Sequence, residues 1–390
     1  MAATTSSSSP PRVLLTGATG FIGGSVLTQL LSSTSPSLQS APITCLVRGA
    51  GRAASLTAAY GDRVRPVLYK DLDDLETASA VAAQHDLVIS TTVSYHPSSV
   101  RALLEGLAQR KRARPGSEQP WLIHTSGTGN VCSRPVSGSW PDDDSPKGRA
   151  FDDAVDDVYG YEAARNAVEP FLQRTTELSV VDAGLELDVR TLVVMAPTIY
   201  GVGSGLFNKR SMQIPAYIAT ALDHGRAVVI GDGEGVWDHV HVRDLAALYE
   251  ILALRVLEER GEALPRGKKG IVFASAGRHS WGDVARGVAR TCHEAGALPD
   301  SKVDSLGLAE ATRRFAESYL GDAADETLVE MGLASSARTI PTVALRLGWM
   351  PARGEEDWQR GFRDDVDAVL KDRREKGNSV GDFSVYTEGK

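Results

Sequence analysis

VLLTGATGFIGG, at residues 13–24, is the stretch that decides the fold of this chain. It reads as a short buried strand, a glycine turn and the first turn of a helix whose apolar pattern continues to Leu31. Backbone N–H groups at the start of such a helix face an anion, and the helix dipole favours negative charge there. Strand, turn and helix in this order predict a site for the pyrophosphate of a dinucleotide.

The three spaced glycines of this turn each have a steric reason. Gly17 permits the tight turn, Gly20 lets the backbone approach the phosphates, and Gly23 lets helix and strand pack closely. A glycine triplet can also be an ordinary strand–helix turn, but here the strand before it and the helix after it are both visible. The residues expected to hold the cofactor at this turn are Thr16, Gly17, Thr19, Gly20, Phe21, Ile22 and Gly23.

The next apolar segment, at residues 42–49, is expected to be the second parallel strand. An acid at the end of that strand would hydrogen-bond the adenosine ribose hydroxyls, whereas an arginine would pair with a 2′-phosphate. The chain has Arg48 and Arg52 there and no acid nearby, so the predicted cofactor is NADP. Either arginine could instead be a solvated loop charge.

Further apolar segments at 64–70, 86–92, 121–128 and 187–195 alternate with helical patterns. This alternation predicts an α/β fold, a Rossmann-type doubly wound parallel sheet with a smaller C-terminal α/β substrate-binding lobe. The long segment at 131–157 is expected to be a functional lid or disordered. The predicted divisions are a disordered tail at 1–11, the dinucleotide-binding domain at 12–200, mainly the substrate-binding lobe at 201–378, with 236–275 returning to the first domain, and a polar tail at 379–390.

Composition narrows the range of partners and compartments. A net charge of −8 argues against nucleic-acid binding, and no apolar run approaches the ~20 residues that span a bilayer. The three cysteines have neither metal-ligand nor redox spacing, which favours reduced thiols, a cytoplasmic protein and no metal site. The first residues have the features of neither a secretory signal nor a transit peptide. We expect a small-molecule substrate and consider a homodimer.

Several motifs together resemble the extended short-chain dehydrogenase/reductase family, which includes NAD(P)-dependent nucleotide-sugar epimerases and dehydratases and dihydroflavonol-type reductases. The resemblance covers almost the whole chain and specifies the fold far better than the reaction. It rests on Thr16-Gly17-x-x-Gly20-x-x-Gly23, Asp71-Leu72, the hydroxyl cluster at 125–128, Tyr161 with its helix, Pro197-Thr198-Ile199-Tyr200-Gly201, Gly231-Asp232-Gly233 and His241-Val242-Arg243-Asp244-Leu245-Ala246.

The resemblance also implies catalytic and further cofactor-binding residues. Family members carry a Ser or Thr near the end of the fifth strand, and a Tyr followed four residues later by Lys. Tyr161 fits the tyrosine, but Arg165 stands at the lysine position, and a guanidinium cannot shuttle a proton. Additional cofactor contacts implied by the family are Asp71, Leu72, Thr91, Tyr161, Arg165, Pro197 and Ile199.

The hydroxyl position of the family falls on Gly127, which leaves Ser126 and Thr128 as candidates to polarise the substrate, with Thr128 slightly favoured. These hydroxyls could instead only bond the backbone at a strand end. Tyr161 could likewise pack beside the cofactor without taking part in catalysis.

A further departure from the family concerns the substrate. Nucleotide-sugar enzymes of the family carry an Arg shortly before the His-Val-x-Asp stretch, and this chain has Trp237 there. An indole cannot bind a pyrophosphate bidentately but stacks on a flat or apolar ligand. His96 and Tyr200 are further predicted substrate contacts, whereas His239 and His241 are expected in core or capping roles.

The sequence therefore predicts an NADP-dependent oxidoreductase acting on a small aromatic, polyketide-like or terpenoid-like carbonyl or alcohol. Tyr161 would be the acid, Thr128 or Ser126 the polarising group and Arg165 the cationic neighbour. Because the lysine is missing, two alternatives stay open. One is a nucleotide-binding sensor without redox turnover, and the other is an isomerase, dehydratase or cyclase on the same fold.

Overall fold

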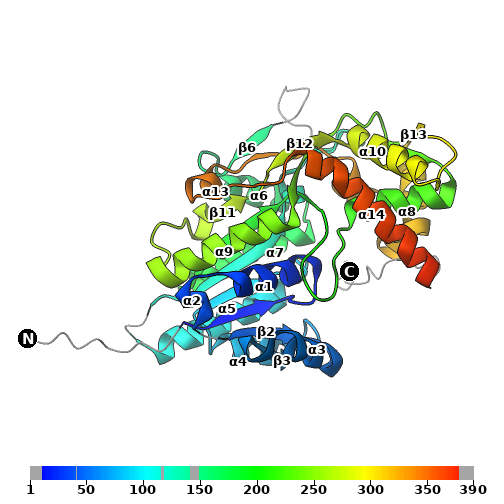
Figure 1. Cartoon of the computed structure of the whole chain (residues 1–390). Coiled ribbons are helices and arrows are strands. Elements are labelled where there is room, and N and C mark those ends of the chain that lie inside the picture. Colours follow the sequence, from blue (N-terminus) through cyan, green and yellow to red (C-terminus); the bar gives the residue numbers. More distant parts are fainter. Residues whose placement is uncertain (1–10, 41, 116–117, 141–148, 377–390) are drawn as a thin grey trace, which may run out of the picture.

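A computed structural model describes residues 11–40, 42–115, 118–140 and 149–376 of the chain (Figure 1). Its centre is a seven-stranded parallel sheet in the order β11-β7-β5-β4-β1-β2-β3. This arrangement confirms the predicted Rossmann-type α/β fold. The strands are β1 (Val13–Thr16), β2 (Ile43–Val47), β3 (Val64–Leu68), β4 (Leu87–Ser90), β5 (Trp121–Gly127), β7 (Arg190–Ala196) and β11 (Ile271–Phe273).

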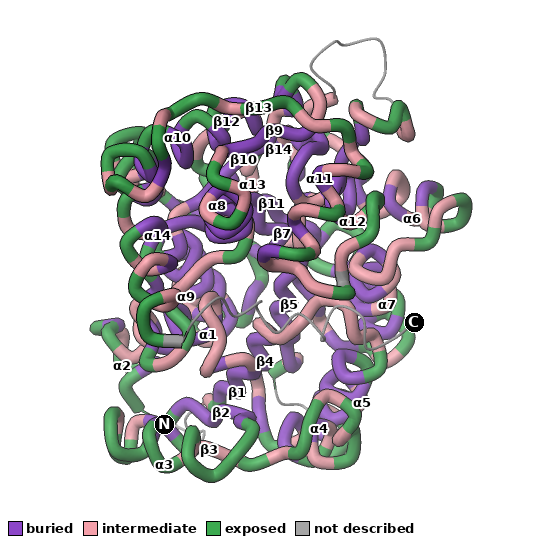
Figure 2. The backbone as a smooth tube through the Cα atoms, turned by 90° about the vertical axis from the view of Figure 1, so that its right-hand side faces the viewer, coloured by how far each residue is buried: buried purple, intermediate pink, exposed green. Residues whose placement is uncertain are grey.

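Helices cover both faces of this sheet, which is why its inner strands are apolar almost without interruption. Figure 2 shows the central strands buried and the outer turns of the helices exposed. On one face lie α1 (Phe21–Ser32), α3 (Ala50–Tyr60) and α9 (Val242–Glu259), and on the other lie α4 (Leu75–Ala82), α5 (Pro97–Ala113) and α7 (Leu172–Glu186). A short helix, α2 (Pro36–Gln39), contacts α9.

The strand register brings the carboxyl ends of the strands to one edge. Thr16 at the end of β1 lies opposite Leu46 on β2 and Ser90 on β4. Gly127 at the end of β5 lies opposite Ala196 at the end of β7. The loops that follow these strands therefore meet along one edge, where open α/β sheets bind their ligands.

A second hydrophobic core lies beyond this edge and is built mainly from the last third of the chain. In Figure 1, α8, α10 and α14 gather on the side of the molecule away from β2 and β3. The small sheets are β12-β10-β8, β13-β9 and β14-β6. The elements are β6 (Ala150–Asp152), α6 (Val158–Val168), β8 (Thr198–Tyr200), α8 (Gln213–His224), β9 (Ala227–Ile230), β10 (Val236–His241), β12 (Gly277–Ser280), α10 (Trp281–Glu294), β13 (Val303–Leu306), α11 (Leu308–Phe315), α12 (Glu326–Leu333), β14 (Arg338–Ile340), α13 (Thr342–Arg346) and α14 (Glu355–Lys376).

Two segments differ from the sequence-based expectation. Residues 131–157, expected to be a loop, contain β6, which pairs with β14 from the far end of the chain. No element was expected at residues 170–186, where α7 lies, because buried polar side chains such as Arg174 and Glu177 interrupt its apolar stripe. Within the segments predicted to be tails or a lid, residues 1–10, 141–148 and 377–390 lie outside the described part of the chain.

Helices α4 and α5 pack closely because α5 has a glycine at their contact. A Cβ at Gly106 would stand 2.8 Å from the Cβ of Ala82 and still closer to the backbone oxygen of Ser79. We predict that Gly106→Ala forces the helices apart and lowers the free energy of unfolding by about 1–3 kcal/mol. Urea denaturation measures the loss.

The matched control for this substitution is Gly51→Ala on α3, where an added Cβ meets no atom within 4 Å. Alanine is the better helix former, so this variant should be as stable as the parent or more stable by up to about 1 kcal/mol. Equal stability of the Gly106→Ala variant and the parent would contradict the close packing of α4 on α5.

Candidate functional site

The glycine turn between β1 and α1 packs against the segment that follows β4. Gly17 has φ +76°, and a Cβ there would stand 2.5 Å from the backbone oxygen of Thr91. A Cβ at Gly23 would overlap the backbone oxygen of Gly17 and the hydroxyl of Thr91. The hydroxyl of Thr91 is fixed because it donates to the backbone oxygen of Thr16, at 2.7 Å. The positive φ of Gly17 agrees with the tight turn predicted there, and the contacts of Gly23 agree with the close packing of helix on strand predicted there.

The surroundings of Gly20 are less crowded than those of Gly17 and Gly23. Its backbone, at φ −86° and ψ 177°, suits any residue, and a Cβ there would meet only the oxygen of Gly17, at 3.2 Å. No side chain caps α1, and its first turn contains no acid. An uncapped helix N-terminus beside a backbone that a ligand can approach suits a pyrophosphate. The residues present therefore fit a dinucleotide cofactor.

The loop at 201–212 lies across the start of α1. A Cβ at Gly205 would stand 2.6 Å from the Cα of Gly24, so the two backbones touch. The backbone N–H of Ser204 donates to the hydroxyl of Ser25, and the hydroxyl of Thr28 donates to the oxygen of Ser204. This glycine-rich loop was predicted to belong to the substrate-binding lobe. The structure shows that it also packs on α1.

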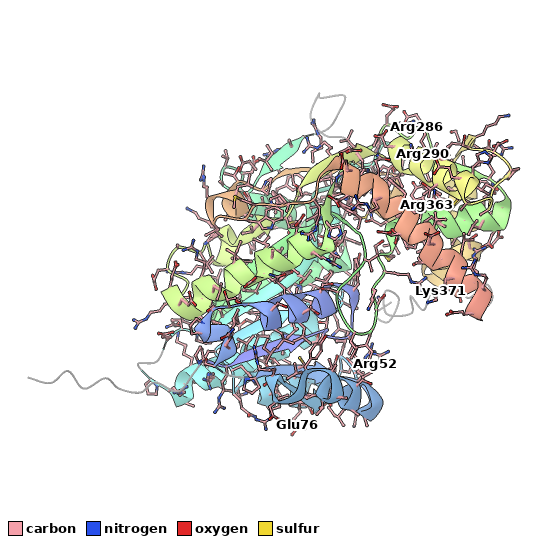
Figure 3. All side chains as sticks on the ribbon, viewed as in Figure 1. Arg52, Glu76, Arg286, Arg290, Arg363 and Lys371 are labelled. Carbon is pink, nitrogen blue, oxygen red and sulfur yellow. The ribbon has the colours of Figure 1, made fainter. Side chains whose placement is uncertain are left out.

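The two arginines expected to select the cofactor lie near the same edge. Arg48 directly follows β2, Arg52 lies in the first turn of α3 (Figure 3), and both side chains are exposed. Burial raises the pKa of Tyr69, just after β3, and the nearby charge of Arg48 partly offsets that rise. Within the described ranges neither arginine forms an ion pair. The choice of NADP over NAD stays a prediction.

The remaining predicted cofactor residues lie along this edge and differ in exposure. Asp71 is exposed and accepts a hydrogen bond from the backbone N–H of Asp73, while Leu72 is half-buried. Pro197 is buried between β7 and β8, and Ile199 is half-buried on β8. The backbone oxygen of Thr19, in the glycine turn, accepts from Asn208 in the loop over α1. The hydroxyl of Thr16 is buried without a partner among the described residues, and Phe21 and Ile22 form the first turn of α1.

At the end of β5, the space beside Gly127 is filled by the side chain of Gln173 from the start of α7. A Cβ at Gly127 would stand 3.1 Å from Gln173 Nε2 and 3.2 Å from its Oε1. Gln173 Nε2 donates to the hydroxyl of Ser94, which follows β4, at 2.7 Å. Sequence analysis missed both Gln173 and Ser94. The glycine at the family's hydroxyl position was the available signal, because it frees room for a neighbouring side chain.

The two hydroxyls expected to polarise the substrate are enclosed. Asn130 Nδ2 donates to the hydroxyl of Ser126, at 3.2 Å, and to Glu177 Oε2, at 2.7 Å. Thr128 is fully buried, and its hydroxyl has no partner in the described ranges. Ser126 thus faces the interior behind β5. A catalytic role for either hydroxyl stays a prediction.

Tyr161 and Arg165 lie on α6, the helix that precedes α7 in the chain. The ring of Tyr161 packs on Phe151 of β6, with 4.7 Å between ring centroids. Arg165 is buried, donates to the backbone oxygen of Cys132 and lies over the ring of Trp140. These contacts join α6 to β6 and the segment at 131–140.

Helix α7 also contributes side chains near the end of β5. Gln173 lies beside Gly127, and Glu177, one helical turn later, receives the hydrogen bond of Asn130 behind Ser126. Spacing of four residues puts both on one face of α7. The catalytic roles expected of Tyr161 and Arg165 stay predictions.

Two buried acids lie between α6, α7 and β5. Glu162 and Glu177 are fully buried, and the carboxyl oxygens of Glu162 have no hydrogen-bond partner among described residues. Burial, reinforced by the charge of Glu177, raises the pKa of Glu162 well above its usual range. Burial raises the pKa of Glu177 to about 7, although hydrogen bonds from Ser126 and Asn130 oppose the rise. Both carboxyls therefore keep their protons to a higher pH than an exposed glutamate does.

Of the predicted substrate contacts, Trp237 lies near Gly129, just after the end of β5. A Cβ at Gly129 would stand 4.0 Å from the Trp237 ring and 3.7 Å from Gln173 Oε1. Trp237 is only 4% exposed and packs on Trp281, and its indole N–H has no partner in the described part of the chain. The indole and the carboxamide thus border the same glycine.

The other two predicted substrate contacts, His96 and Tyr200, make contacts within the protein. His96 caps α5 by accepting from the backbone N–H of Ser99, and its Nε2 lies 3.2 Å from a carboxylate oxygen of Asp73. Tyr200 is 1% exposed and packs edge-on against Trp358.

Among the described residues no helix is long and apolar enough to cross a membrane. The same residues hold no group of His, Cys, Asp and Glu side chains that could bind a metal ion.

Comparison with known proteins gives two family matches. Residues 144–263 match the NAD dependent epimerase/dehydratase family, and residues 15–86 match the NAD-binding family of male sterility proteins. The oxidase ucsJ of Acremonium sp. is 32% identical over 308 residues, which cover 77% of this chain and 84% of that protein. An uncharacterised protein of Schizosaccharomyces pombe is 28% identical over 250 residues, covering 62% and 70% of the two chains.

Solved structures agree in fold. The dTDP-glucose 4,6-dehydratase DesIV of Streptomyces venezuelae, determined with NAD bound, has a TM-score of 0.61 at 16% identity and covers 93% of this chain and 98% of its own. The UDP-glucose 4-epimerase of Thermotoga maritima has a TM-score of 0.54 at 14% identity, covering 92% and 99%. At these identities the likeness concerns the fold alone.

The open position of Gly20 generates a prediction about cofactor binding. Gly20→Val should abolish binding of NADP and NAD because a branched side chain would occupy the approach of the pyrophosphate. Its folded structure should persist, since the backbone angles suit valine. Cofactor fluorescence titration and thermal melting measure the two effects.

Gly23→Val is the contrasting variant, because its Cβ would overlap backbone atoms and should also lower the melting temperature. An unchanged dissociation constant in the Gly20→Val variant would place the phosphate site elsewhere.

The buried acids generate a prediction about pH. The folded protein keeps protons on these carboxyls that the unfolded chain releases above its ordinary pKa of 4.5, so the free energy of unfolding falls as pH rises from about 4.5 through about 7. Glu162→Gln should flatten this fall and raise the free energy of unfolding at pH 8 by about 1–3 kcal/mol. Urea denaturation at pH 5 and pH 8 measures it.

Glu234→Gln removes an exposed loop carboxyl and serves as the control, which should keep the parent's pH dependence. If Glu162→Gln instead destabilised the protein more at pH 8 than at pH 5, Glu162 would be an ionised, paired group and the interpretation would be wrong.

Proposed function

The chain belongs to the NAD-dependent epimerase/dehydratase family of extended short-chain dehydrogenases/reductases, and from that premise we propose that it is an NADP-dependent oxidoreductase. The proposed substrate is a small, flat carbonyl compound of aromatic, polyketide-like or terpenoid-like character, or the corresponding alcohol. The observation that carries the proposal is the open cradle at Gly20, with an uncapped helix N-terminus beside it and an exposed arginine directly after β2.

The chemistry of a reductase fits the edge of the sheet where these groups meet. Bound NADPH would supply a hydride, with its electron pair, to the carbonyl carbon, and the oxygen that takes up the π pair of the C=O bond would be protonated from solvent. The protein's part is to hold the carbonyl in place, to stabilise the charge that develops on oxygen and to limit the access of water.

The nature of the substrate is inferred from Trp237. Its indole borders Gly129 at the end of β5, where a flat ligand could lie against the ring. Nucleotide sugars are disfavoured, because tryptophan replaces the arginine that would pair with their phosphates. The relative from Acremonium is named as an oxidase, which is consistent with redox chemistry.

One observation favours a second candidate, an NADP-binding protein without redox turnover. The family's lysine position holds Arg165, which is buried and donates to the backbone oxygen of Cys132, so the proton-shuttling pair of family reductases is incomplete in this chain. Consumption of NADPH absorbance with a panel of aromatic ketones and quinones would support the oxidoreductase. Tight NADP binding with no turnover on the whole panel would favour the second candidate.

Cofactor choice is the sharpest prediction of this proposal. Arg48 should pair with the 2′-phosphate, a charge-assisted contact worth about 1.5–3 kcal/mol, so NADP should bind at least about tenfold more tightly than NAD. Arg48→Glu should reverse the preference. Titration calorimetry with both cofactors measures the ratio.

Arg65→Glu makes the same charge change on an exposed position of β3 and is the control, which should keep the preference for NADP. Equal affinities of the parent for both cofactors would remove Arg48 as the selecting residue.

A further inference from the structure

Gly127 and Gln173 are sterically linked. A Cβ at position 127 would stand 3.1 to 3.2 Å from both polar atoms of the Gln173 carboxamide, closer than ordinary van der Waals contact. Glycine at 127 therefore makes room for the amide. Members of the family that the chain resembles carry a hydroxyl at this position of the fifth strand, so an amide from α7 occupies the space beside the missing hydroxyl.

The carboxamide is held by one hydrogen bond, and its residue is partly exposed. Gln173 Nε2 donates one N–H to the hydroxyl of Ser94, at 2.7 Å, and its second N–H is not used in that bond. Gln173, Ser94, Gly127 and Gly129 are all partly exposed, unlike Ser126 and Thr128, which are buried. A ligand at the end of β5 can therefore reach the amide more easily than either hydroxyl.

The neighbours of the Gln173 amide indicate which kind of ligand could bind beside it. The point where a Cβ of Gly129 would stand lies 3.7 Å from Gln173 Oε1 and 4.0 Å from the ring of Trp237. At the strand end, Gly127 borders the amide, and Gly129 borders both the amide and the indole. A flat carbonyl compound could stack toward the indole and direct its oxygen to the N–H of the amide.

We propose that Gln173, oriented by Ser94 and given room by Gly127, is the residue that donates a hydrogen bond to the carbonyl oxygen of the substrate. This inference rests on the proposed function and assigns the role that sequence reasoning gave to Ser126 or Thr128. A carboxamide is neutral and gives up no proton at ordinary pH. Its contribution is to fix the carbonyl and to stabilise negative charge on oxygen, while the proton comes from water.

The test uses phenanthrenequinone, a flat aromatic diketone, as the probe and the full chain throughout. Gln173→Met keeps the length of the side chain and removes the amide. In NADPH-dependent reduction of the probe it should lower kcat by about 100-fold, because one preorganised donor is lost. Ser94→Ala removes the hydrogen-bond partner that orients the amide but keeps the amide itself, so it should lower kcat by a smaller factor. The dissociation constant for NADPH should stay within about threefold of the parent in both variants.

The matched control is Gln109→Met on α5, where another glutamine Nε2 donates to a serine hydroxyl, that of Ser79, at 3.3 Å. Its kinetics should equal those of the parent. Thermal melting of all variants shows whether each is folded. A Gln173→Met enzyme within about twofold of the parent, or a larger loss with Tyr161→Phe than with Gln173→Met, would overturn the assignment.

A binding measurement separates this inference from the proposed function. Calorimetry of the quinone with the NADP⁺-loaded protein should show about tenfold weaker binding by Gln173→Met than by the parent, as expected for one lost hydrogen bond. If the parent turns over no carbonyl compound, the proposed function fails, and this binding ratio still decides the role of Gln173. Equal binding by parent and variant, or no binding of the quinone by the parent, would overturn the inference.

Discussion

The steric fit between the β1–α1 turn and the segment after β4 is the constraint on which the rest of the structure depends. No Cβ fits at Gly17 or Gly23, so the turn lies directly against Thr91 and α1 starts at the carboxyl edge of the sheet. That position leaves the N–H groups of the helix facing outward beside Gly20. The loop at 201–212 then packs on the same helix through glycine contacts of its own.

A second feature is the polar interior between α6, α7 and β5. Asn130 joins Ser126 to Glu177, Arg174 donates to the backbone oxygen of Asn130, and Glu162 lies nearby without a hydrogen-bond partner among the described residues. Buried polar groups of this kind cost stability unless they are paired, and they fix one arrangement when they are. Here they hold α7 in a position that places Gln173 at the end of β5.

Much of the fold and part of the site could be predicted from local sequence. The strand–turn–helix signal at 13–24 identified the glycine turn, and apolar runs alternating with helical patterns indicated the doubly wound sheet. Trp237 was predicted as a substrate contact from its place before His-Val-x-Asp; its ring borders Gly129, just after β5, and the substrate contact stays a prediction. Helix α7 was not predicted, because its buried face includes the charged residues Arg174 and Glu177. A search for periodic apolar residues does not detect such a face.

The sequence by itself determined the fold class and the glycine turn that opens α1 at the carboxyl edge of the sheet, because these depend on neighbouring residues and on the period of apolar side chains. Only the tertiary structure decided which side chains meet beside the end of β5. Gln173 and Ser94, 79 positions apart in the sequence, are joined there by a hydrogen bond. Such a meeting follows from how helices and loops pack around the whole sheet, and no local pattern encodes it.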